Sequence, residues 1–274
     1  MNIVKLTMLF SSFGALSLAD LAYADDSSTK DDSAKVEKPW SMADKYYGKA
    51  EMAAARKAVQ KAAGGGSNYF IMGDRLETQF TNGEDTFVWD AQGWYGTDEN
   101  KIWIKTEGDY NLSDGSLEDA EVQALWSKPI SAFWDVQAGI RYDIEPKGRT
   151  HAVLGVQGLA PYWFEVDIAA FLSTKGDVTS RIETEYDFIL SQRLFLQPRA
   201  ELEFSAQDIN ELNIRAGITN FDLGLRLRYE FKREVAPYIG VEWQKNLGET
   251  AGLVRANGGD PDKIALLIGL RTWY

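Results

Sequence analysis

The chain has 274 residues and a formal net charge of −12, with one histidine and no cysteine. The lack of cysteine excludes disulfides and thiolate metal sites. The acidic balance argues against nucleic acid as a partner, because phosphate binding depends on clustered Lys and Arg, and it leaves cations or simple solubility as the reason for the charge.

The N-terminus has the pattern of a secretory signal peptide. Lys5 precedes an apolar run over 6–18, and the small residues of Ala22-Tyr23-Ala24 form a cleavage site. We therefore expect cleavage after Ala24 and export without a lipid anchor, since no cysteine is present to be acylated. After the signal, no apolar run approaches the roughly 18 residues that a spanning helix needs, so any membrane crossing is expected to use strands.

The region before the strands divides into a leader, a helix and a hinge. Residues 25–40 are rich in Asp, Ser and Lys, which predicts disorder. Over 41–63 the Ala, Lys, Glu and Gln content favours a helix, with Ser41 and Asp44 as its cap. A triple glycine then forms a hinge. The predicted domains are a signal peptide at 1–24, a leader with a periplasmic helix at 25–66 and a β-barrel at 67–274.

From Tyr69 onward the hydrophobic pattern has the period of strands, in twelve segments separated by turn residues. The short connections leave no room for crossover helices, so neighbouring strands are expected to be antiparallel. The segments are 69–80, 86–95, 101–111, 117–127, 132–143, 150–160, 162–173, 179–190, 193–206, 216–231, 236–246 and 264–274.

The segment from Arg181 to Leu190, RIETEYDFIL, shows the alternation most clearly. Alternate side chains of a strand point to opposite faces, so this segment has one charged face and one mostly apolar face. The strands at 162–173, 193–206 and 216–231 share this polarity. If the charged faces line a wet interior, the lumen-lining residues are Glu165, Asp167, Arg181, Glu183, Glu185, Asp187, Arg193, Arg199, Glu201, Glu203, Arg226 and Arg228.

The apolar faces of these strands fit two architectures. A soluble barrel would bury them inward and leave the charges in bulk water, whereas a membrane barrel would turn them to lipid around a polar interior. Segments of about ten residues favour the membrane barrel, because soluble strands usually have about five or six. Aromatic residues near segment ends match the girdle of such a barrel: Trp126, Trp134, Tyr162, Trp163, Trp243, Trp273 and Tyr274.

The last segment, IALLIGLRTWY, ends on Tyr274. A terminal aromatic residue on the last strand is a feature of bacterial outer-membrane barrels that their assembly machinery reads. Together with the signal peptide and the alternation, it predicts an all-β fold. We expect a single transmembrane antiparallel β-barrel of about twelve strands, in contact with outer-membrane lipid, preceded by a short flexible helical segment.

Long phrases of the strand region resemble the copper resistance protein B family, and the resemblance covers about 69–274. The phrases are WDAQGWYG (89–96), KIWIKTEG (101–108), EDAEVQALWSKPISAFWDVQAGIRYD (118–143), GVQGLAPYWFEVDIAAF (155–171), SRIETEYDFILSQRLFLQPRAELEF (180–204) and DLGLRLRYEFKREVAPYIGVEWQKNLG (222–248).

The resemblance implies an outer-membrane protein of bacterial copper resistance, which works beside a periplasmic multicopper oxidase and exports or sequesters copper. The family often carries an N-terminal stretch rich in Met and His, whose thioether and imidazole groups suit copper. This chain departs from that pattern, because its leader and helix contain only Met42 and Met52 and no histidine. The resemblance therefore does not carry high-capacity copper binding over to this leader.

Two interpretations of the lumen charges stay open, since opposite charges on adjacent strands brace a barrel wall and carboxylates also pass divalent cations such as Cu(II). The individual candidates for a metal ligand are Met42, Met52, Met72 and His151, each of which also fits an ordinary packing role. No catalytic residue or organic cofactor is predicted, because the sequence offers no nucleophile elbow of the G-x-S-x-G kind for its one histidine to activate. The alternatives to copper export are a small-solute porin or closed structural barrel and, third, an outer-membrane hydrolase.

Overall fold

The computed structural model describes residues 42–63, 66–81 and 83–274. The predicted signal peptide at 1–24, the leader at 25–40, Ser41 of the predicted cap and two glycines of the hinge lie outside these residues.

Two helices precede the strands, α1 (Asp44–Tyr47) and α2 (Lys49–Ala63). The sequence predicted one continuous helix here, but Gly48 interrupts it with a φ of 81°, which glycine adopts without steric cost. An ion pair of 2.6 Å between Arg56 Nη1 and Asp44 Oδ1 joins the two helices. In the part of the chain that the structure describes, no helix is long and apolar enough to cross a membrane.

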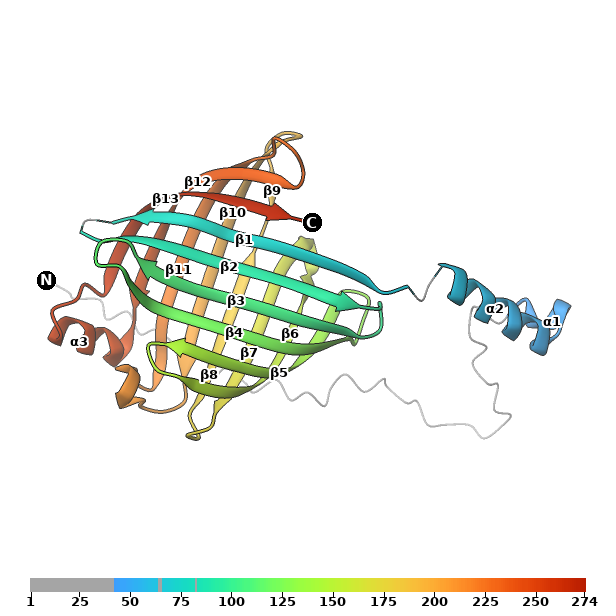
Figure 1. The fold of residues 1–274 in the computed structure, drawn as a ribbon, viewed down its shortest axis with the longest axis horizontal. Helices are drawn as coiled ribbons and strands as arrows, with labels where there is room; N and C mark the ends of the chain where they lie inside the picture. The colour runs from blue at the N-terminus through green and yellow to red at the C-terminus, as the bar shows by residue number, and fades with distance from the viewer. Residues whose placement is uncertain (1–41, 64–65, 82) are drawn as a thin grey trace, which may run out of the picture. The chain divides into compact units, whose positions relative to one another are not determined.

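The rest of the chain is dominated by strands that form one sheet (Figure 1). Their bounds are β1 Asn68–Phe80, β2 Asp85–Gly96, β3 Lys101–Asn111, β4 Ser116–Pro129, β5 Trp134–Glu145, β6 Arg149–Ala160, β7 Phe164–Ser173, β8 Val178–Glu185, β9 Phe188–Ile189, β10 Leu194–Ser205, β11 Gly217–Tyr229, β12 Val235–Asn246 and β13 Asp262–Trp273. The 3-10 turns η2 Pro161–Trp163 and η3 Asn210–Leu212 and the helix α3 Gly248–Ala256 lie in the connections.

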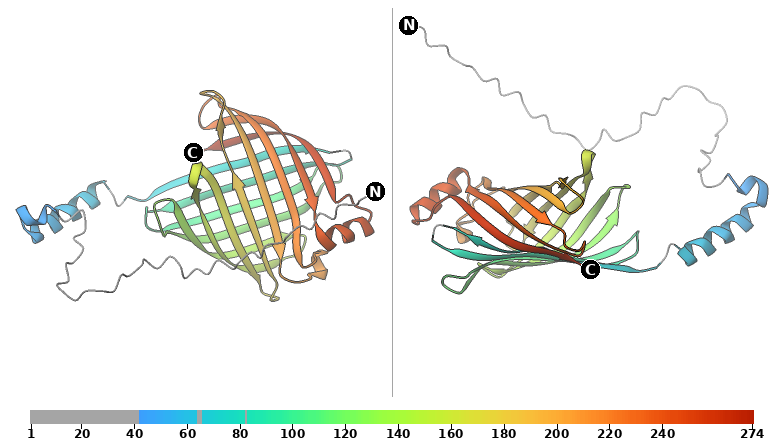
Figure 2. Two further views of the ribbon diagram at one scale, coloured as in Figure 1. Left: turned by 180° about the vertical axis from the view of Figure 1, so that it is seen from behind. Right: turned by 90° about the horizontal axis from the view of Figure 1, so that it is seen from above.

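The sheet closes on itself, because β1 pairs antiparallel with both β2 and β13 (Figure 2). Backbone hydrogen bonds in both directions between Ile71 and Tyr274, with N···O distances of 3.0 and 2.8 Å, extend this pairing beyond the end of β13. Counting β8 and β9 as one interrupted strand, the thirteen segments make twelve strands. The predicted antiparallel barrel is therefore confirmed.

The interruption between β8 and β9 has a local cause. The sequence predicted one continuous strand over 179–190, but the register places Pro198 of β10 beside Tyr186, immediately after the pair Arg199 and Glu185. Proline has no N–H to donate, so the ladder loses a hydrogen bond at this point. On the other side, pairing with β7 ends at Glu165 opposite Glu185, so the chain beyond it has no partner there.

Burial distinguishes the two architectures that the alternation allowed. Charged side chains are buried inside the barrel, with Glu77 0% and Arg226 3% exposed, whereas on the outer face Ile264, Leu266 and Ile268 are 68%, 62% and 56% exposed. A soluble barrel would show the reverse distribution. The apolar outer face and polar interior are those of a membrane-spanning barrel.

The two ends of the barrel differ in the length of their connections. At the end where β1 begins, the turns are 97–100, 130–133, 161–163, 190–193 and 230–234, and we call this the short-turn end. The opposite end carries the two longest connections, 206–216 with η3 and 247–261 with α3, and we call it the long-loop end. The first residue of β1 and the last residue of β13 therefore both lie at the short-turn end.

Candidate functional site in the barrel interior

Four strands place a row of acidic side chains side by side on the inner wall. Asp167 of β7 lies opposite Glu183 of β8, Glu183 opposite Glu201 of β10, and Glu201 opposite Asp222 of β11. Like charges directly opposite one another destabilise a sheet. The row therefore requires cations close by, and arginines on the neighbouring residue pairs supply them.

Arg199 and Arg181 balance this row from either side. Arg199 Nε lies 2.6 Å from Glu183 Oε1, and its Nη2 donates to Glu201. Arg181 Nε lies 3.2 Å from Glu201 Oε1. Both guanidinium groups are almost enclosed, with side-chain exposures of 2% for Arg199 and 16% for Arg181. The charges are thus paired within the barrel, as buried ions must be.

Arg181 also reaches the far side of the barrel. Its Nη1 lies 2.7 Å from Glu107 Oε2 on β3, and its Nη2 lies 3.3 Å from Glu121 Oε2 on β4. Arg75 of β1 holds the same Glu107 through Nη2 and Oε1 at 2.7 Å. Strands β3 and β8 are separated around the sheet by β4 to β7. These ion pairs therefore cross the lumen instead of running along one wall.

A second buried cluster joins β1, β11 and β12. Arg226 donates to Glu77 through Nε and Nη2 at 2.9 and 2.7 Å, and its Nη2 also lies 2.5 Å from Glu242 Oε2. The hydroxyl of Tyr238 and the amide of Gln79 donate to Glu77 as well, at 2.9 Å each. This cluster holds together the side of the interior formed by β1, β11 and β12. The other side of the interior contains a cavity.

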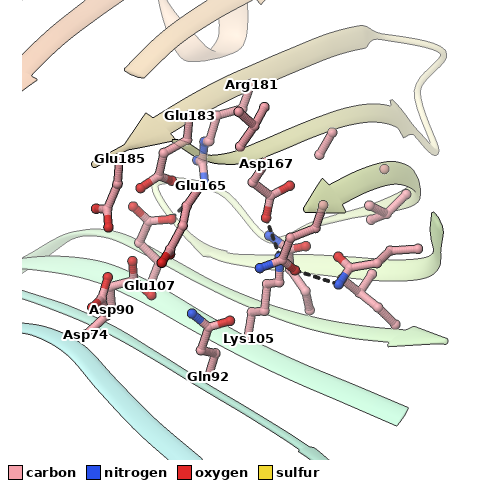
Figure 3. Close-up of a pocket in the computed structure, with 18 of the residues that line it drawn as sticks. Asp74, Asp90, Gln92, Lys105, Glu107, Glu165, Asp167, Arg181, Glu183 and Glu185 are labelled. Atoms are coloured by element: carbon pink, nitrogen blue, oxygen red, sulfur yellow. Dashed lines mark hydrogen bonds and ion pairs between the residues drawn. The ribbon is translucent and has the colours of Figure 1, made fainter. Parts of the chain in front are cut away.

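A cavity of about 370 Å³ lies inside the barrel, toward the short-turn end (Figure 3). Carboxylates from facing walls project into it, and Glu165 on β7 is exposed to solvent. Among the described residues, none forms a hydrogen bond or ion pair with the Glu165 carboxylate, whereas the carboxylate of Asp90 lies 3.4 Å from Arg75. The charged lining residues are Asp74, Asp90, Lys105, Glu107, Glu121, Glu165, Asp167, Arg181, Glu183, Glu185 and Arg271.

The cavity also has an apolar part. Leu125, Val153 and Phe171 are buried together, at 3%, 5% and 3% exposure, and Trp103 and Ala169 pack against them. In a barrel with a polar interior, these side chains exclude water from one side of the lumen.

At the long-loop end, both long connections pack against the barrel. The loop residue Ile209 and the α3 residue Ala251 are buried, at 4% and 5% exposure. Glu211 of the same loop accepts a hydrogen bond from Arg149 Nη2 at 2.8 Å and another from Lys175. The hydrogen bond from Lys175 holds the pKa of Glu211 below its ordinary value. The loop 206–216 is thus held against β6 and the turn 174–177.

Most of the predicted lumen residues lie on the inner wall. Asp187, in the break between β8 and β9, pairs with Arg228 at 2.6 Å. Arg193 was predicted to line the lumen, but it lies exposed in the turn 190–193. The N–H groups of Leu190 and Ser191 donate to the carbonyl of Leu194, so β10 begins one residue later than predicted.

The four candidate metal ligands are not brought together. Met42 is exposed before α1, and Met52 lies beyond the break at Gly48, so they do not share one helix as predicted. Met72 lines the cavity, with its Sδ 3.7 Å from Arg271 Nη2. His151 is buried with Nε2 2.9 Å from Asp143 Oδ2. Among the described residues, no three His, Asp or Glu side chains form a group that could hold a metal ion.

Sequence reasoning missed the wall made by β1 to β4 and β13. Asp74 and Arg75 are adjacent residues that both face inward, because the pairing of β1 shifts between Gly73 and Arg75. Such a bulge breaks the strict alternation on which the prediction relied. On β3, Lys105 and Glu107 are two residues apart in the phrase KIWIKTEG and therefore lie on the same face of the strand. This spacing could have identified Glu107 as a lumen residue.

Comparison with known proteins gives consistent matches. Residues 67–274 match the family described as Copper resistance protein B precursor (CopB). Copper resistance protein B of Escherichia coli is 41% identical over 208 residues, 76% of this chain and 70% of that protein. The homolog from Pseudomonas syringae pv. tomato is 38% identical over the same shares. The solved NanC porin has a TM-score of 0.50 at 14% identity, covering 75% of this chain and 99% of that one, a likeness of fold alone.

Proposed function

The chain belongs to the copper resistance protein B family, and we propose that its barrel sits in the bacterial outer membrane and handles copper ions as its substrate. The observation that carries this proposal is the cavity with its carboxylates on facing walls. Within this function, we assign the cavity to the capture of copper ions for export or sequestration.

The orientation of the barrel determines which compartment the cavity serves. Outer-membrane barrels have short turns in the periplasm and longer loops outside the cell. The cavity is near the short-turn end, and the long connections 206–216 and 247–261 lie at the other end. Copper would therefore enter the cavity from the periplasm.

The chemistry of the lining suits exchange of a divalent ion. Carboxylate oxygens prefer Cu(II) and release it readily, whereas a thioether such as that of Met72 prefers Cu(I). Oxygen donors dominate the cavity wall. We therefore propose Cu(II) as the main substrate. A periplasmic multicopper oxidase, which makes Cu(II) from Cu(I), is the corresponding partner.

We also propose that the barrel assembly machinery engages Tyr274. Its backbone extends the β1–β13 pairing to Ile71, and its ring centroid lies 6.1 Å from that of Tyr69. A side chain at this position is available while the barrel closes, because its ring is on the exposed outer surface.

The proposed function predicts a copper phenotype that does not depend on the N-terminal segment. Loss of the protein should lower the copper concentration that stops growth. A chain lacking 25–66 behind an intact signal should restore most of the tolerance, because the cavity lies entirely within the barrel. Growth on graded copper sulfate, with outer-membrane levels checked by immunoblot, measures both effects.

Two outcomes would contradict this proposal in different ways. A deletion strain as tolerant as its parent would remove the copper assignment and leave a porin or a closed structural barrel. A truncated chain that reaches normal outer-membrane levels without restoring tolerance would place the copper site in the N-terminal segment instead of the cavity.

A further inference from the structure

The inner end of the cavity is formed by one cationic side chain. Arg181 projects from β8 toward the opposite wall, where Glu107 lies 2.7 Å from its Nη1 and Glu121 lies 3.3 Å from its Nη2 (Figure 3). On its own side it lies 3.2 Å from Glu201. One guanidinium therefore joins three strands that are not all neighbours around the barrel, β3, β4 and β10.

The partners of Arg181 are themselves held in place. Glu107 is also bound by Arg75 at 2.7 Å, and Glu121 by Arg141 Nη1 at 2.8 Å. Glu121 is 3% exposed, so its carboxylate is not free to follow a moving partner. Movement at this level of the lumen is consequently left to the Arg181 side chain, which lines the cavity and is 16% exposed.

An ion pair between β3 and β7 also crosses the lumen. Lys105 of β3 contacts Asp167 of β7 at 2.5 Å, and the Asp167 side chain is 29% exposed. Lysine binds as a flexible point charge, whereas the planar guanidinium of arginine contacts two carboxylates at once. The pair of Lys105 and Asp167 thus narrows the cavity, while Arg181 closes it.

We propose that Arg181 is the gate of the barrel: its ion pairs to Glu107 and Glu121 close the lumen, and their release connects the cavity to the long-loop half. This inference rests on the proposed transport function and deepens it. A divalent cation that enters the cavity meets the carboxylate of Glu107 and competes with Arg181 for it. The same residues that attract the substrate therefore hold the gate closed when no substrate is bound.

Conductance of the full-length barrel in planar bilayers containing KCl tests the gate without copper. We expect low conductance for the unmodified protein and a several-fold increase for Arg181→Gln, which cannot form the ion pairs. Arg193→Gln is the matched control, because it removes the same charge from the exposed turn, and it should conduct like the unmodified protein. Slower gel migration on boiling verifies that each barrel is folded.

A second variant tests whether the ion pairs, and not the arginine alone, close the lumen. Glu107→Gln with Glu121→Gln keeps Arg181 but removes its partners on the far wall, so conductance should also rise. If Arg181→Gln fails to fold, this double variant decides by itself. A folded Arg181→Gln or a folded double variant that conducts no more than the unmodified protein would overturn the proposal.

Addition of copper sulfate separates the gate from the copper function. Cu²⁺ should raise the conductance of the unmodified protein and change that of Arg181→Gln much less. A conductance of the unmodified protein that does not respond to Cu²⁺ would overturn release by the cation. By contrast, failure of the proposed copper function would appear as a copper-tolerant deletion strain, whatever the conductance of the variants in KCl.

Discussion

Replacing Arg226 by Met is expected to destabilise the barrel by about 3–5 kcal/mol, because it leaves the buried carboxylates of Glu77 and Glu242 without their cation. These two residues are 0% and 2% exposed, so water cannot take the place of the guanidinium. The cluster also links β11 to β1 across β12 and β13. Urea unfolding of the barrel refolded in detergent should show a much lower midpoint.

Two further variants distinguish unpaired charge from lost packing. Arg226→Met combined with Glu77→Gln and Glu242→Gln removes the stranded charges, so much of the lost stability should return. Arg193→Met changes an exposed turn and should leave the midpoint unchanged. If Arg226→Met unfolds at the same urea concentration as the unmodified barrel, the cluster does not hold these strands together.

The strand pattern could be predicted from sequence because the charged and apolar residues alternate with a period of two over long segments. Within RIETEYDFIL, Arg181 and Glu183 were predicted to lie on the same face of the strand, and in the structure this face lines the lumen. The prediction was wrong at the end of this segment. The break there depends on Pro198 in the neighbouring strand, and only the register between the two strands reveals it.

The candidate site was predicted only for one wall of the barrel. The alternation is regular on β7 and β8, over 194–203 of β10 and over 220–229 of β11, but on β1 the bulge near Asp74 places adjacent residues on the same face. The contact between Arg181 and Glu107 spans 74 positions of sequence and depends on closure of the whole sheet. No local pattern specifies such a contact. The cavity and its gate therefore emerged only from the structure.

The carboxylates of the inner wall differ in how closely they are paired. Glu183, Glu185 and Asp187 each have a close donor, from Arg199, Gln197 and Arg228 respectively. Such pairing braces the wall. Asp90 and Glu165 face the cavity. Asp90 is weakly paired, 3.4 Å from Arg75, and Glu165 has no ion pair or hydrogen bond among the described residues, so these carboxylates are the most available to an ion.

Neutralising Asp90 and Glu165 together, as Asp90→Asn with Glu165→Gln, should therefore reduce copper handling while the barrel still assembles. Each carboxylate attracts a divalent ion by about 1–2 kcal/mol across a half-exposed site, so copper binding should weaken by about tenfold or more. Arg75 keeps its 2.7 Å contact with Glu107 in this variant, so it is not left unpaired. Titration of the purified barrel with CuSO₄ and growth of the complemented deletion strain on copper measure the effect.

The matched control is Glu84→Gln with Glu249→Gln, which removes two exposed charges at the long-loop end without touching the cavity. It should bind copper and restore tolerance like the unmodified protein, because a charge outside the cavity is screened by salt within about a Debye length. If both double variants bind copper equally well, the change in binding depends on the net charge of the protein and not on the position of the carboxylates. Full tolerance from Asp90→Asn with Glu165→Gln would show that copper does not use these carboxylates.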